Sequence, residues 1–189
     1  VSISRATTAS PTAPSGSTNS LPAAQLADAH HLVRTYDEIE ALLLLSARAC
    51  GRVLPQHLTL AAVVEMVHMA TLVHDDVLDG AKVRRRVACV NQRWDNQTAV
   101  LLGDFLYARA FALSTDLSSR LCSRHLAETT RRLCVGEIEQ STRRFDFEMS
   151  QEDYESIAGA KTATLYGAAC ELGARYPGGN LEVGGEMAQ

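Results

Sequence analysis

The sequence predicts an all-α protein, and three observations support this fold class. From Tyr36 onward, apolar residues recur at helical spacing, and few stretches alternate Val, Ile and Thr as strands do. Beyond residue 24, proline occurs only at Pro55 and Pro177, so helices can run long without a break. The chain has 189 residues, 46% of them hydrophobic, which is enough to bury one core.

Each predicted helix has its own sequence signal. Periodic apolar segments predict helices near residues 36–50, 58–79, 97–116, 119–142 and 151–174. Gly51 ends the first helix and Gly80 ends the second, because glycine readily adopts the left-handed conformation that follows a helix C-terminus. Ser150 begins the last helix as its N-cap, and Glu152 and Asp153 place negative charge in its first turn.

Two terminal segments differ in composition from the helical region between them. Residues 1–24 are rich in Ser, Thr, Ala and Pro, contain one Arg and no acid, and are expected to be a disordered leader. An organelle transit peptide is an alternative for this leader, although one Arg is little support for it. Residues 25–176 are the expected helical domain, and the glycines of residues 177–189 predict a loop or tail.

Charge and cysteine content argue against several classes of protein. The net charge of −4 argues against a nucleic-acid-binding protein, for which a basic surface is expected. The five cysteines are scattered without metal-knuckle spacing, which indicates reduced core thiols and a cytoplasmic location. No uninterrupted apolar run reaches the ~18 residues of a membrane span, so no transmembrane segment is expected.

The segment His74-Asp75-Asp76-Val77-Leu78-Asp79, at the end of the second predicted helix, carries the strongest chemical signal. At about 3.6 residues per turn, Asp75 and Asp79 project from one helix face, and His68 lies about two turns earlier on the same stripe. The helix macrodipole disfavours acids at a C-terminus, and a hard divalent cation would offset that cost. Carboxylates suit Mg²⁺, and the following run Arg84-Arg85-Arg86 suits a phosphate group.

Other interpretations of these polar residues stay open. Acids at a helix end that are followed by arginines often form a solvated, self-paired surface. Here, apolar residues surround the acids on most faces, which predicts a buried helix whose acids need partners. His68 taken alone is equally consistent with a hydrogen-bonded core histidine. Asp104 and Gln140 are expected to be structural polar groups between helices.

Four segments in order resemble the motifs of the trans-isoprenyl diphosphate synthases, or polyprenyl synthetases. These segments are residues 65–85, 99–106, 136–140 and 161–163. The resemblance spans roughly residues 36–176 and is to medium- and long-chain members, such as octaprenyl, heptaprenyl and solanesyl diphosphate synthases. It implies a partial isoprenoid-synthase helical bundle around a central apolar cavity. The Gly-Gly-Lys-Arg-like segment and the second aspartate motif of the family have no counterpart here, so the resemblance is to the N-terminal part of the fold.

The resemblance also implies a role for each matching polar residue. Asp75 and Asp79 would hold Mg²⁺, with Asp76 in support, and Lys161 joins these three acids as a catalytic residue. The remaining matches would bind the two substrates: His68 and Arg85 for isopentenyl diphosphate, and Arg84, Lys161 and Thr162 for the allylic prenyl diphosphate.

Ala70 and Thr71 match the positions that set product length in the resembling family. In that family, bulky aromatic residues at these positions form the floor of the pocket and stop growth of the prenyl chain early. Ala70 and Thr71 are small, so the resemblance implies a deep pocket and a long prenyl product.

The resemblance therefore implies a Mg²⁺-dependent prenyltransferase of isoprenoid biosynthesis. It would condense an allylic prenyl diphosphate with isopentenyl diphosphate and work as a homodimer or heteromer. Because only one acid cluster is present, the 189 residues by themselves are expected to be inactive. Two alternatives remain, a non-catalytic subunit of a heteromeric prenyl synthase and a plain helical interaction protein.

Overall fold

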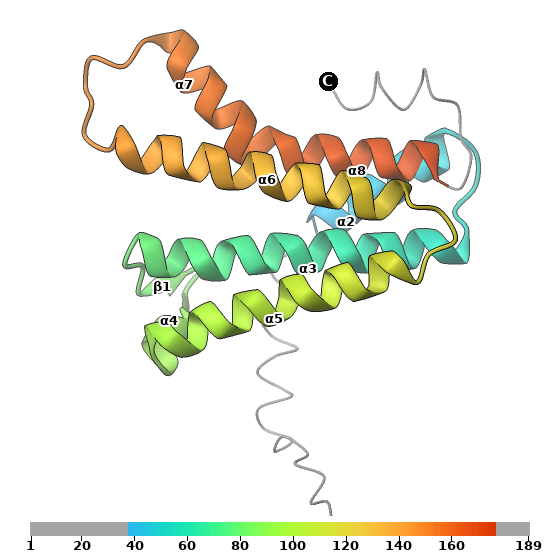
Figure 1. The fold of residues 1–189 in the computed structure, drawn as a ribbon, viewed down its shortest axis with the longest axis horizontal. Helices are drawn as coiled ribbons and strands as arrows, with labels where there is room; N and C mark the ends of the chain where they lie inside the picture. Colours follow the sequence, from blue (N-terminus) through green and yellow to red (C-terminus); the bar gives the residue numbers. More distant parts are fainter. Residues whose placement is uncertain (1–37, 177–189) are drawn as a thin grey trace, which may run out of the picture.

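The computed structural model describes residues 38–176, which form a bundle of long helices (Figure 1). The predicted leader, residues 1–24, and the predicted tail, residues 177–189, lie outside the described residues. The main helices are α2 (Glu38–Ala49), α3 (Pro55–Leu78), α5 (Asn96–Thr115), α6 (Leu121–Thr142), α7 (Gln151–Ala158) and α8 (Thr164–Arg175). The predicted all-α class is confirmed, and each predicted helical segment is present with shifted ends.

The helices form two layers that are joined along one side by α2. α3 packs side by side with α5, and α8 packs beside α6 (Figure 1). α2 contacts both α3 and α8 and so links the layers. Their shared core is built mainly from aliphatic side chains, among them Ile39, Leu43, Leu60, Val64, Leu126, Leu165 and Leu172.

α3 is the central helix of the bundle, as the sequence predicts. It begins at Pro55, three residues before the predicted start, because proline is well tolerated in the first turn of a helix. No residue from 63 to 77 is exposed, and Val63 and Val67 are completely buried. By length and composition alone, α3 is apolar enough to cross a membrane, a property that the core helix of a bundle shares.

The connection from α3 to α5 contains a small hairpin and a short helix that the sequence pattern does not predict. β1 (Val83–Arg84) pairs antiparallel with β2 (Val87–Ala88), and α4 (Val90–Arg93) follows. The two turn residues, Arg85 and Arg86, have φ angles of 47° and 70°. Strands of two residues are too short for an alternating pattern to appear in the sequence, which explains the omission.

The last predicted helix, residues 151–174, is interrupted where the sequence predicts continuity. A π-helical turn, η1 (Gly159–Ala163), separates α7 from α8, and the Thr164 hydroxyl donates to the Gly159 carbonyl over 3.0 Å. Two predicted helix-end signals are confirmed, at Ser150 and at Gly80. The Ser150 side chain accepts a hydrogen bond from the Asp153 amide, and Gly80 has a φ of +64° just after α3.

Candidate active site

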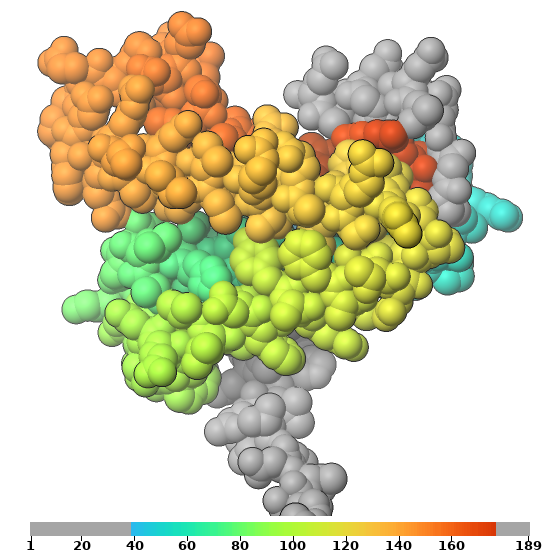
Figure 2. Space-filling view, viewed as in Figure 1, coloured from blue at the N-terminus to red at the C-terminus, as the bar shows by residue number. Residues whose placement is uncertain are grey.

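A cavity of about 430 Å³ lies between the two helical layers. In the space-filling view, the layers meet along a seam with α6 on one side and α3 with α5 on the other (Figure 2). The cavity walls combine aliphatic residues with a cluster of polar ones: Leu72, Leu78, Leu133, Ile138 and Leu165 with His68, Thr71, His74, Asp75, Tyr107, Cys134, Glu137, Lys161, Thr162 and Tyr166. Such a chamber suits a ligand with an apolar body and a charged end.

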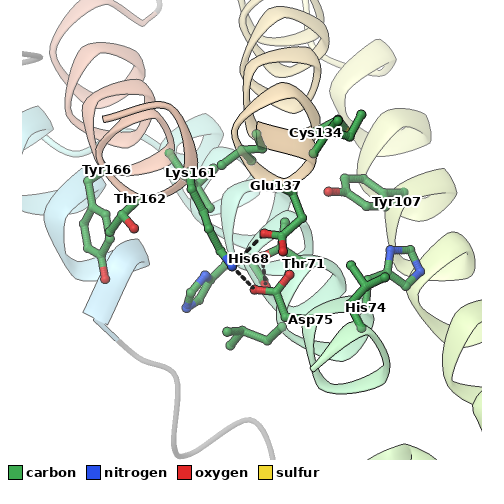
Figure 3. Close-up of a pocket in the computed structure, with 15 residues that line it drawn as sticks. His68, Thr71, His74, Asp75, Tyr107, Cys134, Glu137, Lys161, Thr162 and Tyr166 are labelled. Atoms are coloured by element: carbon green, nitrogen blue, oxygen red, sulfur yellow. Dashed lines mark hydrogen bonds and ion pairs between the residues drawn. The ribbon is translucent and has the colours of Figure 1, made fainter. Parts of the chain in front are cut away.

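Lys161 lies at the polar centre of this cavity, between two carboxylates. Its ammonium nitrogen is 2.6 Å from Glu137 Oε2 and 3.6 Å from Asp75 Oδ2 (Figure 3). The three side chains are 23%, 19% and 18% exposed for Lys161, Glu137 and Asp75 respectively. Because α3, α6 and η1 each supply one of them, the cluster forms only when these elements pack together.

The electrostatics of this cluster leave Asp75 short of positive charge. Burial raises the pKa of the Asp75 carboxyl, and the nearby Glu137 raises it further, while Lys161 and Arg84 lower it only partly. Burial by itself would lower the pKa of Lys161, but the hydrogen bond to Glu137 and the charges of Asp75, Glu137 and Asp79 raise it above the ordinary value. The site therefore keeps a charged lysine and would gain from a further cation at Asp75.

Asp76 has a different partner and points away from the cavity. Arg84 Nε and Nη2 each lie 2.8 Å from Asp76 Oδ1, and Asn91 donates to the Asp76 carbonyl over 3.1 Å. The Asp76 side chain is 8% exposed. Successive residues are about 100° apart around a helix, so Asp76 turns towards the hairpin while Asp75 faces the cavity. This pairing differs from the predicted role of Arg84 at the allylic diphosphate.

Asp79 meets a third cation, Arg144, at the C-terminal end of α6. The Arg144 Nη2 atom is 2.6 Å from Asp79 Oδ1, and both side chains are about half exposed, at 53% and 44%. Arg144 is 65 residues from Asp79 in the sequence, and no local pattern links the two. The three aspartates thus lie beside three different cations, Lys161, Arg84 and Arg144, which come from separate parts of the chain.

The structure brings only part of the predicted substrate-binding set to this cavity. His68, Thr71 and Thr162 line it with Asp75 and Lys161. Arg84 and Arg85 are not among the described residues that form its walls, and Arg85 is exposed in the hairpin turn. Arg84 belongs to β1 and Arg85 to the hairpin turn, and the helical pattern of the sequence did not reveal this hairpin.

The two residues predicted to set product length occupy different surroundings. Thr71 lines the cavity, and its hydroxyl donates to the His68 carbonyl over 2.7 Å. Ala70 is completely buried and is not among the described residues that line the cavity, so its role in product length stays a prediction. Thr71 is four residues before Asp75 and shares its face, whereas Ala70 is five residues before it and is rotated into the core.

Several residues without a predicted role contribute to the cavity. Glu137 holds Lys161, and Tyr107 lines the opposite wall, where burial raises its pKa. His74 also lines the cavity, with Nε2 3.1 Å from the Val100 carbonyl, and a Cβ atom at Gly103 would overlap its ring. No local pattern marks these contacts, because each joins two helices that are distant in sequence.

Asp104 and Gln140 lie where helices meet, as the sequence predicts, but their side chains reach solvent. Both side chains are exposed in the structure, although Asp104 lies 3.6 Å from His74 Nε2. Polar residues within a helix reveal its period, but not which of its faces a neighbouring element covers. Asp104 thus connects α5 to α3 through His74, and Gln140 lines a pocket that α6 shares with α7.

The acid cluster fits a hard divalent cation when other ligands complete its coordination. Within residues 38–176, no group of three or more acidic, histidine or cysteine side chains is arranged to hold a metal ion. Asp75 and Asp79 are four residues apart at the end of α3, and Asp75 lacks compensating charge. Mg²⁺ commonly takes one or two carboxylates together with waters and phosphate oxygens, which is what this donor set offers.

Comparison with known proteins identifies close relatives of the chain. Residues 40–187 match the family model described as polyprenyl synthetase. The chain is 42% identical over 129 residues to all-trans-nonaprenyl-diphosphate synthase (geranyl-diphosphate specific) of Rhodobacter capsulatus, covering 68% of this chain and 40% of that protein. It is 39% identical over 127 residues to octaprenyl diphosphate synthase of Escherichia coli, covering 67% and 39%. The chain thus spans about 40% of the length of these curated relatives.

Solved structures of similar proteins share this helical arrangement. Heptaprenyl diphosphate synthase from Staphylococcus aureus matches with a TM-score of 0.79 and 27% identity, covering 92% of this chain and 55% of that one. A polyprenyl synthase from Caulobacter crescentus, complexed with calcium and isoprenyl diphosphate, matches with a TM-score of 0.77 and 32% identity, covering 88% and 57%. The helical bundle is therefore that of the isoprenoid synthase fold.

Proposed function

The chain belongs to the polyprenyl synthetase family, and we propose that the complete protein condenses an allylic prenyl diphosphate with isopentenyl diphosphate to lengthen a polyprenyl diphosphate. The observation that carries this proposal is the charged cluster of Asp75, Glu137 and Lys161 set into an apolar cavity. A charged end and an apolar chain are the two parts of such a substrate. The names of the nonaprenyl and octaprenyl relatives support a long product.

The proposed reaction begins when the allylic carbon–oxygen bond breaks and diphosphate leaves with the electron pair. Mg²⁺ held by Asp75 and Asp79 would supply Lewis-acid neutralisation of that leaving group. Asp76 would support this site indirectly, by fixing the hairpin through its pair with Arg84. Lys161 and Thr162 would donate to its phosphate oxygens. The aliphatic walls would exclude water from the allylic cation until the alkene of isopentenyl diphosphate attacks it and loses a proton.

The second substrate would bind near the same end of the cavity. His68 lines the cavity and is proposed, with Arg85, to hold isopentenyl diphosphate. Arg84 is better assigned to its pair with Asp76, because its Nε and Nη2 atoms both contact the Asp76 carboxylate. Arg84 would then affect substrate binding indirectly, because it fixes the position of the hairpin and so of Arg85.

Assembly and location belong to the same proposal. The chain is 36% identical over 123 residues to heptaprenyl diphosphate synthase component 2 of Bacillus subtilis, covering 65% of this chain and 35% of that protein. The word component in that name supports a protein that works in an oligomer, which we propose to be a homodimer or a heteromer. A cytoplasmic location is proposed from the scattered cysteines, which lack metal-knuckle spacing. The 189 residues expressed alone remain predicted to be inactive, since they span only part of the relatives.

Product analysis with the complete protein tests the proposed function. Incubation with farnesyl diphosphate, isopentenyl diphosphate and Mg²⁺ should yield longer prenyl diphosphates on chromatography. Asp75→Asn should lower the rate by ~10²–10³, as expected for loss of a main electrostatic contact. Asp116→Asn makes the same change on an exposed residue at the end of α5 and should leave the rate unchanged. Wild-type protein that forms no product would contradict the proposal.

A further inference from the structure

Gly136 lets η1 approach α6 more closely than any other residue would allow. A Cβ atom at position 136 would lie 2.8 Å from the Lys161 amide nitrogen and 2.9 Å from the Ala160 methyl. Real Cβ atoms do not come this close to backbone atoms, so a side chain here would push η1 away. The backbone of Lys161 is therefore seated directly on α6.

The π-helical turn lies at the same point of contact. η1 covers Gly159–Ala163 and contains both Lys161 and Thr162, which line the cavity. Single π-helical turns within α-helices occur frequently at functional sites. The turn and Gly136 together bring the start of the Lys161 side chain against α6.

Glu137, the residue after Gly136, binds the other end of the same side chain. Its carboxylate is 2.6 Å from the Lys161 ammonium, whereas Asp75 is 3.6 Å away. The Lys161 backbone thus packs directly against Gly136. Its ammonium group is bound by Glu137 (Figure 3). A flexible lysine chain that is fixed at both ends loses much of its rotamer freedom before any ligand arrives.

We propose that Glu137 is a positioning residue that keeps the Lys161 ammonium in the cavity for a diphosphate group after a metal ion takes over Asp75. This inference deepens the proposed function and rests on it. Asp75 is the weaker partner by distance, so it can exchange Lys161 for a cation while Glu137 retains it. Lys161 then needs no large rearrangement to meet phosphate oxygens.

The sign of one substitution separates this role from a simple charge effect. A carboxylate near a diphosphate repels it, so removing the charge of Glu137 should strengthen diphosphate binding if charge is its only influence. If Glu137 acts by placing Lys161, removing it should weaken binding instead. The two roles therefore predict opposite changes for Glu137→Gln, which has almost the same shape as the wild-type side chain.

Titration calorimetry of inorganic pyrophosphate in the presence of MgCl₂, with the complete protein, tests the proposal. Glu137→Gln should weaken binding on the order of tenfold, the effect of losing a charged hydrogen-bond partner. Lys161→Met should weaken it at least as much, and the double variant should bind no worse than Lys161→Met, because Glu137 acts through that lysine. Glu139→Gln, an exposed glutamate two residues along the same helix, is the matched control and should bind like the wild type.

Each outcome supports or overturns the proposal. Glu137→Asp keeps the charge but has a shorter side chain, and it should also weaken binding. This variant replaces Glu137→Gln as the test if circular dichroism shows that Glu137→Gln folds poorly. Unchanged or tighter binding in both Glu137 variants would overturn the positioning role, as would fully additive losses in the double variant. Wild-type protein that does not bind Mg²⁺ and pyrophosphate would instead overturn the proposed function, and this inference with it.

Discussion

Asp75 and Asp76 are neighbours in the sequence, yet they occupy two unlike regions of the molecule. On the cavity side, Asp75 shares Lys161 with Glu137, and burial raises its pKa. On the hairpin side, Asp76 receives two nitrogens of Arg84 at 2.8 Å. One acid has its own complete partner, and the other lies beside a second acid and shares a single cation with it. An acid that the protein itself does not neutralise is the better candidate to bind an external cation.

Breaking the hairpin-side pair should produce the largest change in stability. Asp76→Ala removes the contacts of Arg84 Nε and Nη2 with this buried carboxylate. It should lower the free energy of unfolding by about 2–3 kcal/mol, the cost of losing charged hydrogen bonds in a buried place. Urea unfolding followed by circular dichroism measures this change. Asp79→Ala, which removes a half-exposed pair, is the control and should cost less than about 1 kcal/mol. Equal losses of unfolding free energy in both variants would contradict the proposed difference between the Asp76–Arg84 pair and the Asp79–Arg144 pair.

The cavity side can be probed by filling it near Thr71. In the complete protein, Thr71→Phe places a ring on the cavity wall and should shorten the prenyl product seen by chromatography. Ala70→Phe is the matched control, because Ala70 lies in the core and off the described wall. It should instead destabilise the fold by ~1–3 kcal/mol through overpacking. A shorter product from Ala70→Phe with wild-type stability would show that the cavity wall is misassigned.

The smallest expected effect is the contribution of Asp75 to the stability of the folded protein as a function of pH. Its folded-state pKa is raised, so the folded protein binds this proton more tightly than the unfolded chain does. Ionisation of Asp75 therefore lowers stability as pH rises from the ordinary value of 3.8 through the folded-state pKa. Asp75→Asn should be at least as stable as the wild type at neutral pH, and its advantage should disappear below pH 3.8.

Thermal unfolding at several pH values in metal-free buffer measures this difference. Asp116→Asn, in which an exposed acid is replaced, should show no such dependence relative to the wild type. The Asp75→Asn variant could instead be less stable than the wild type at neutral pH. That result would mean that Lys161 neutralises Asp75 more fully than the geometry indicates.

The helices and the grouping of residues on α3 could be predicted because they depend on local period. Apolar spacing, Ser150 and Gly80 marked the helix positions and ends, and about 3.6 residues per turn placed Thr71 on the face of Asp75. The same arithmetic, applied to Ala70, would have placed it off that face. The motifs of the resembling family led to Lys161 before the structure located it beside Asp75.

The sequence by itself therefore determined the helical class, the central position of α3 and the acid cluster at its end. The tertiary structure decided which cation each acid meets, because Lys161, Arg84 and Arg144 lie on three elements whose approach depends on packing. It also decided the position of Glu137, which binds Lys161 only because Gly136 admits η1. Contacts between distant segments leave no period in the sequence, and this is the physical reason that they appear only in the folded chain.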